Sequence, residues 1–191
     1  MAVTTLDPNT ALIVIDLQRG IVAYPTVHPI AEVVQHAVQL ADAFRAQALP
    51  VFFVNVSAAA PGRNDQGSGG TKTFPAEFIE LVPELKRQST EPLVTKRTWG
   101  AFMHTDLEAQ LKQRGVTQVV VVGVSTSIGV ESTARQAYEL GFNVTLATDA
   151  MTDTNADAHA NSVTRIFPRL GETGRTADVL ALLARLPTRK A

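Results

Sequence analysis

The chain has 191 residues, enough for one large domain with a substantial core, and its 45% hydrophobic and 18% charged content is typical of a compact soluble protein. A net charge of −1, with no cluster of Lys or Arg, argues against binding to nucleic acid or to an anionic membrane surface. Cysteine is absent, which excludes disulfides, thiolate metal sites and any thiol nucleophile.

Apolar runs in the sequence are short. The longest, residues 11–15 and 119–122, cannot span a bilayer. The N-terminus lacks the basic stretch and apolar segment of a signal peptide. We therefore expect a single cytoplasmic domain over residues 1–191.

The first half of the chain predicts a β-α-β unit. Residues 11–15 form a continuous apolar, β-branched run that ends at Asp16 and is typical of a buried parallel strand. Apolar residues at helical spacing predict an amphipathic helix over 30–48, and residues 51–54 predict a second strand. Such a unit implies parallel pairing with a right-handed crossover. Residues 57–73 have loop composition, and their length indicates a functional or mobile segment.

The second half continues the alternation of strands and helices. Thr105 followed by Glu108 predicts a capping box at the start of a helix that runs to Gln113 and ends at Gly115. The other expected elements are short helix 75–81, short strand 92–95, strand 118–122, turn 123–127, helix 129–140, strand 143–147, helix 157–167, an extended piece near 170–172 and a final helix from about 176. This order predicts a three-layer α/β/α sandwich around a mainly parallel sheet.

Candidate chemistry lies at the carboxyl ends of the predicted strands, where open parallel sheets bind ligands. Asp16 ends the first strand and Lys96 follows the third. Partial burial would disfavour the charged form of Asp16, whereas a nearby lysine would favour it. Such a couple can transfer protons. A structural role, in which Asp16 caps the following turn and pairs with Lys96, is the alternative.

The turn over residues 123–129 opens a helix and presents free backbone N–H groups, which suit an anion, an oxyanion or a carbonyl oxygen. Ser125, Thr126, Ser127 and Ser132 are either nucleophiles or helix-capping residues. No Gly-x-Ser-x-Gly elbow surrounds them and no histidine is evidently placed as their base. The glycine spacing also departs from the dinucleotide-binding and Walker patterns.

Histidines and aromatic residues give weaker signals. The four histidines form no metal-ligand spacing, so no metal site is predicted, and His36 is expected on a helix surface. They are His28, His36, His104 and His159. Trp99 and Phe102 either wall a pocket for a planar substrate or belong to the core or a subunit interface.

Four sequence blocks together resemble the isochorismatase-like (cysteine hydrolase) superfamily, over about residues 8–185. They are Val14-Ile-Asp-Leu-Gln-Arg-Gly20, Val94-Thr-Lys-Arg-Thr-Trp-Gly-Ala-Phe102 with Thr105-Asp-Leu107, Gly123-Val-Ser-Thr-Ser-Ile-Gly-Val-Glu-Ser-Thr-Ala-Arg135 and Gly141-Phe-Asn-Val-Thr-Leu-Ala-Thr-Asp-Ala150. The resemblance implies a Rossmann-like sheet of six parallel strands in the order 3-2-1-4-5-6 and a homodimer or homotetramer. It also implies catalytic roles for Asp16 and Lys96 and a cis peptide at Val124–Ser125.

The chain departs from the amidases of this superfamily at the nucleophile. Gly129 stands where they have the catalytic cysteine, and residues 55–59 lack the Asp-x-His metal motif of nicotinamidases. Isochorismatases also have glycine at that position, but commonly with a histidine two residues earlier, where this chain has Ser127. The resemblance therefore does not identify isochorismate as the substrate.

The leading hypothesis is a hydrolase that needs no metal, cofactor or thiol and acts on a small carboxylated or cyclic metabolite, for example an enol ether. Asp16 would be the general acid and base, while Lys96 would tune it and hold substrate charge. Amides at Ser125 and Gly129 would bind oxygen. Further binding residues would be Gln18, Trp99, Phe102 and Val124. The alternatives are a catalytically silent relative that binds a ligand or forms an oligomeric scaffold, and attack by Ser125 or Ser127.

Overall fold

The structure is a computed structural model that describes residues 3–65, 67 and 72–187. Its centre is a six-stranded sheet in the order β3-β2-β1-β4-β5-β6, with every adjacent pair parallel. The strands are β1 Thr10–Ile15, β2 Val51–Val56, β3 Leu93–Lys96, β4 Gln118–Val124, β5 Asn143–Thr152 and β6 Glu172–Gly174. The predicted strand order is confirmed.

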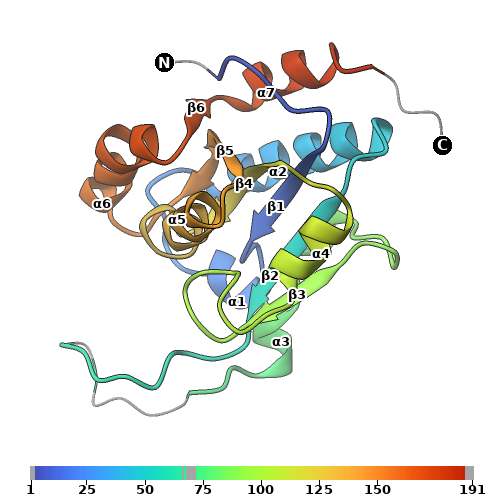
Figure 1. Cartoon of the computed structure of the whole chain (residues 1–191). Helices are drawn as coiled ribbons and strands as arrows, with labels where there is room; N and C mark the ends of the chain where they lie inside the picture. Colours follow the sequence, from blue (N-terminus) through green and yellow to red (C-terminus); the bar gives the residue numbers. More distant parts are fainter. Residues whose placement is uncertain (1–2, 66, 68–71, 188–191) are drawn as a thin grey trace.

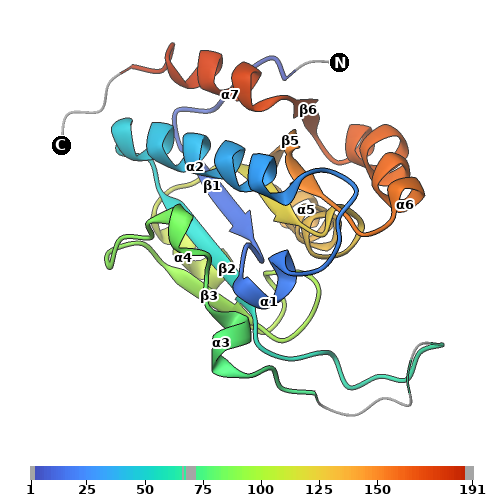
Figure 2. The same cartoon turned by 180° about the vertical axis from the view of Figure 1, so that it is seen from behind.

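Helices cover both faces of the sheet, so the predicted three layers are present (Figures 1 and 2). The α-helices are α1 Arg19–Val22, α2 Ile30–Ala46, α3 Ala76–Ile79, α4 Leu107–Gln113, α5 Glu131–Glu139, α6 Ala156–Asn161 and α7 Thr176–Leu183. None of these helices is long and apolar enough to cross a membrane.

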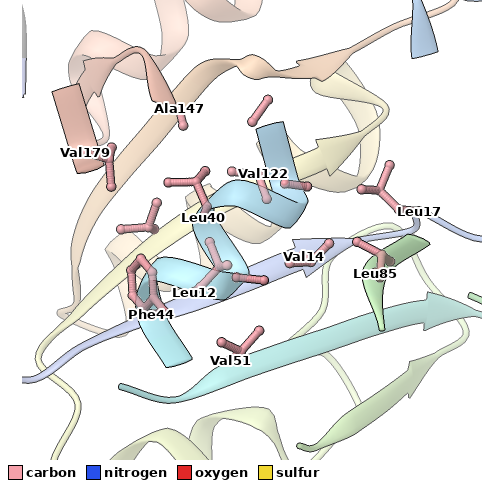
Figure 3. Packing of buried hydrophobic residues seen from close by; sticks show 14 of the residues in the cluster. Leu12, Val14, Leu17, Leu40, Phe44, Val51, Leu85, Val122, Ala147 and Val179 are labelled. Atoms are coloured by element: carbon pink, nitrogen blue, oxygen red, sulfur yellow. The ribbon is translucent and has the colours of Figure 1, made fainter. Parts of the chain in front are cut away.

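The side chains of β1 divide the core into two clusters because successive residues of a strand point to opposite faces. Leu12 and Val14 belong to a cluster with Leu40 and Phe44 of α2, which lie close to them (Figure 3). Ile13 and Ile15 face the other cluster, which contains residues of α4 and α5. Burial of β1 on both faces explains its continuous apolar sequence.

Some predicted boundaries were wrong. Asp106, not Thr105, is the N-cap of α4. The Thr105 hydroxyl donates instead to the Ala101 carbonyl at 2.6 Å, and the bond that this hydroxyl accepts from the Leu107 N–H is longer, at 3.3 Å. The predicted Thr105–Glu108 capping box is therefore absent. A π-helical turn, Thr126–Val130, precedes α5, which begins at Glu131 rather than at residue 129.

The described parts of the segment between β2 and α3, residues 57–65 and 72–75, project from the body of the molecule as an arm (Figures 1 and 2). Its two sides form antiparallel bridges, Ala58 with Thr73 and Asn64 with Gly67. The prediction of a long loop without a helix agrees with the described part of this segment. Because the base of the arm adjoins the ends of β2 and β3, it lies next to the candidate site.

Candidate active site

Asp16 and Lys96 bring together two strand ends that are far apart in the sequence. Asp16 directly follows β1 and Lys96 ends β3, with β2 between them in the sheet. The Lys96 Nζ atom nevertheless lies 2.7 Å from Asp16 Oδ2. Both side chains are buried, and Lys96 is only 2% exposed. The structure thus unites the two charged groups that the sequence singles out.

The environment of Asp16 favours its protonated form more than water would. Burial raises the pKa of Asp16 from 3.8 to about 6, and the charge and hydrogen bond of Lys96 offset part of that rise. Asp16 Oδ1 is buried and has no hydrogen-bond partner among the described residues. The backbone of Asp16 has a φ of +50°, in the left-handed region that non-glycine residues rarely occupy and that is often found at functional sites. The pKa of Asp16 therefore lies closer to neutral pH than that of an exposed aspartate.

The ammonium group of Lys96 already has two acceptors. It donates to Asp16 Oδ2 at 2.7 Å and to the Thr98 carbonyl oxygen at 3.2 Å. A buried ion pair of this kind holds both side chains in place and compensates the charge of each. Lys96 consequently acts on Asp16 directly, rather than standing free in the pocket.

Gly129 lies beside the Asp16 carboxyl. A Cβ atom built at Gly129 would be 3.2 Å from Asp16 Oδ2, 3.0 Å from Ile15 Cγ2 and 3.3 Å from the Val124 carbonyl oxygen. A side chain at this position would therefore project against the carboxyl, and glycine leaves that space open. The Val124–Ser125 peptide just before the turn is cis, as the resemblance implies.

The π-helical turn that carries Gly129 is anchored to the end of β5. The backbone N–H and the hydroxyl of Ser127 both donate to Asp153 Oδ2, at 2.7 and 2.8 Å. His159 Nδ1 lies 2.9 Å from Thr126 Oγ1, and the His159 and His28 rings are 4.7 Å apart. Ser127 thus ties the turn to the end of β5 through both its backbone and its side chain.

Sequence reasoning missed this anchoring network. Asp153 directly follows β5, so the rule that strand ends carry functional side chains could have identified it. The pairing of His28 with His159 had no such signal, because 131 positions separate them and no spacing rule relates them. In the described part of the chain, no three His, Cys, Asp or Glu side chains gather as metal ligands.

A pocket of about 180 Å³ opens in front of Asp16 and Lys96. Of the predicted binding residues, Trp99, Val124, Ser125 and Gly129 line it. The other lining residues are Ile21, Val56, Ala58, Ala59, Ala60, Phe74, Thr98 and Ile128. Residues from α1, the base of the arm and the π-helical turn thus complete a cavity that the strand ends begin.

Two predicted binding residues lie outside the pocket lining. Gln18 is fully buried, and its side-chain amide is used by the backbone: Nε2 donates to the Val56 and Phe78 carbonyls, and Oε1 accepts from the Val56 N–H. Phe102 is 8% exposed and packs in the core with its ring 6.0 Å from that of Phe142. Gln18 and Phe102 therefore support the fold and are not among the residues that line the pocket, and their role in substrate binding stays a prediction.

Comparisons with known proteins agree with this fold. Residues 10–178 match the isochorismatase domain model. The uncharacterized isochorismatase family protein YwoC of Bacillus subtilis is 41% identical over 178 residues, covering 90% of this chain and 93% of that protein. Nicotinamidase 3 of Arabidopsis thaliana is 32% identical over 166 residues, covering 80% and 79%.

Solved structures show the same relationship. An isochorismatase family protein from Burkholderia thailandensis superposes with a TM-score of 0.89 at 43% identity, covering 94% of this chain and 98% of that one. A cysteine hydrolase from Pseudomonas syringae superposes with a TM-score of 0.81 at 25% identity, covering 97% and 98%. With the strand order and the match over residues 10–178, these likenesses show that the chain belongs to the isochorismatase family of hydrolases.

Proposed function

We propose that this hydrolase acts on a small metabolite by acid–base chemistry at Asp16, without a thiol nucleophile. The observation that carries the proposal is a buried carboxyl that lines a pocket, is paired with Lys96 at 2.7 Å and has no side chain at Gly129 in front of it. A relative with a similar fold is described as a cysteine hydrolase, whereas this chain contains no cysteine. The reaction of the present chain must therefore use groups other than a thiol.

Hydrolysis of an enol ether, or of a related bond, suits these groups. Neutral Asp16 donates a proton to the double-bond carbon remote from the ether oxygen, which leaves an oxocarbenium ion, and Lys96 stabilises the carboxylate that results. Water adds to the carbon that carries the ether oxygen and returns a proton to Asp16, so the enzyme ends in its starting state. The hemiketal that forms then breaks down to a carbonyl compound and an alcohol. Backbone amides at Ser125 and Gly129 hold the substrate oxygen during these steps.

We also propose that the reaction needs no metal or cofactor. Asp16 and Lys96 together can supply the proton transfers, and residues 55–59 lack the Asp-x-His motif of nicotinamidases. Removal of divalent ions with EDTA should therefore leave turnover unchanged.

The test is a screen of enol ethers, esters and amides with the wild type, followed by substitution of the acid. We expect Asp16→Asn to reduce turnover of any substrate found by at least about 100-fold, the usual contribution of a general acid. Asp16→Asn leaves a buried ammonium unpaired, so the double variant Asp16→Asn/Lys96→Met, which removes both charges, is made in parallel. Asp157→Asn, on exposed α6, is the matched control. Unchanged turnover in a folded Asp16→Asn variant would falsify the acid–base role.

A catalytically silent ligand-binding protein is the second candidate, and the absence of cysteine is the observation that favours it. Ligands that raise the melting temperature without being hydrolysed would support this alternative. Covalent labelling by phosphonates would instead support attack by a serine, for which Ser125 is the residue that lines the pocket.

A further inference from the structure

The walls of the candidate pocket are mainly apolar. Ile21 and Val56 contribute aliphatic surface to the pocket. Three consecutive alanines, residues 58–60 at the base of the arm, form the wall on that side. Two aromatic rings, Phe74 and Trp99, also line the cavity. Phe74 is held by a stacked contact with Phe78, at 4.6 Å between ring centroids. Such walls bind an apolar, planar molecule well, because contact removes apolar surface from water.

Charge in the pocket is limited to one ion pair. Among the described residues that line it, only Asp16 and Lys96 are charged, and their contact at 2.7 Å makes the ionised pair neutral overall. Arg97, next in the sequence, is exposed and is not part of the lining. The other polar lining side chains, Thr98 and Ser125, offer only uncharged hydrogen-bonding groups. When Asp16 is ionised, no described lining side chain is therefore left to balance an anionic ligand.

A carboxylate entering this pocket would lose hydration without gaining a cation. Burial of an unpaired charge is strongly unfavourable in proteins. Above a pH of about 6, the ionised Asp16 carboxylate would add repulsion to that cost. An uncharged molecule of the same shape escapes both effects and keeps the apolar contacts.

From this juxtaposition of an ion pair and apolar aromatic walls, we infer that the pocket, when Asp16 is ionised, binds a small, uncharged, planar molecule in preference to its carboxylated counterpart. This inference rests on the proposed function for the reaction. It narrows the expected substrate, a carboxylated or cyclic metabolite, to a neutral cyclic one. Selectivity follows from the wall and the ion pair, not from the proton transfer itself.

The experiment compares benzamide with benzoate, which share one planar ring and differ in charge, by isothermal titration calorimetry at pH 8. We expect benzamide to bind at least about 10-fold more tightly than benzoate, corresponding to about 1.4 kcal/mol. Equal or tighter binding of benzoate, or no binding of benzamide, would overturn the inference.

A charge placed in the wall should reverse the preference. Ala60 is exposed and lines the pocket, so Ala60→Lys adds a cation at the rim without disturbing the core. We expect Ala60→Lys to bind benzoate at least about 10-fold more tightly than the wild type does, and the uncharged Ala60→Met to leave benzoate binding weak. A lysine variant that gains no benzoate affinity would count against the charge argument.

Turnover separates this inference from the proposed function. Binding of benzamide in a protein that hydrolyses nothing would remove the acid–base proposal but keep the selectivity. Asp16-dependent hydrolysis of carboxylated substrates only would keep the acid–base proposal and overturn the selectivity.

Discussion

Asp16 illustrates how burial changes the chemistry of a single residue. The residue is 5% exposed, and among the described residues its charged partner is the ammonium of Lys96 at 2.7 Å. Desolvation acts against the charged form and the ammonium acts for it, and desolvation is the larger effect. The net result is an acid whose pKa, at about 6, lies close to neutral pH.

The raised pKa of Asp16 predicts how stability depends on pH. Between a pH of about 4 and 6, Asp16 stays protonated in the folded chain but is ionised in the unfolded chain. Asp16 therefore contributes to the free energy of unfolding below pH 4, and this contribution is lost as the pH rises through 6. We expect the stability difference between wild type and Asp16→Asn to shift against the wild type by on the order of 3 kcal/mol from pH 4 to 7. Urea unfolding at several pH values measures this, and a flat difference would contradict the prediction.

At the scale of elements, Gln18 joins three segments around the site. Its buried amide bonds to β2 at Val56 and to α3 at Phe78, while its own backbone forms the N-cap of α1. The ends of β1 and β2 are thereby tied to the helix that follows the arm. The polarity of Gln18 thus serves the assembly of the site rather than its chemistry.

Truncation of Gln18 should therefore destabilise the fold. Gln18→Ala leaves the Val56 N–H and two carbonyls without their partner, and we expect a loss of about 2–4 kcal/mol in the free energy of unfolding. Gln35→Ala, on the exposed surface of α2, is the matched control and should change stability by less than about 0.5 kcal/mol. Comparable effects of the two substitutions would show that the buried amide bonds contribute little.

At the scale of the whole molecule, several large apolar side chains stay exposed. Trp99 is 61% exposed at the pocket, and Tyr138, Tyr24 and Met103 are each about half exposed. The arm projects away from the sheet (Figures 1 and 2). The family resemblance implies a homodimer or homotetramer, and these exposed side chains are candidates for its interface.

Self-association is a prediction that sedimentation equilibrium tests. The expected particle mass is two or four times the 20.5 kDa of one chain. A particle of 20.5 kDa at micromolar concentrations would show that the site is complete within one chain, with Trp99 open to solvent.

Much of the fold could be predicted because the local pattern and the tertiary structure agree. The apolar runs at β1 and β4 are buried on both faces, and the alternation of strands and helices leads to parallel pairing. Predicted element boundaries were less accurate where a side chain hydrogen-bonds to a tertiary partner, as Thr105 does with Ala101 and Ser127 with Asp153. Local sequence propensity does not take such partners into account.

The sequence by itself determined that Asp16 and Lys96 lie at strand ends, that Gly129 stands in the turn and that the chain contains no cysteine. Only the tertiary structure decided that Gln18 and Phe102 support the core, that His28 meets His159, and that Lys96 is already paired. The physical reason is that residue order fixes which groups are available, whereas pKa, pairing and access depend on which of them the packed chain removes from water together.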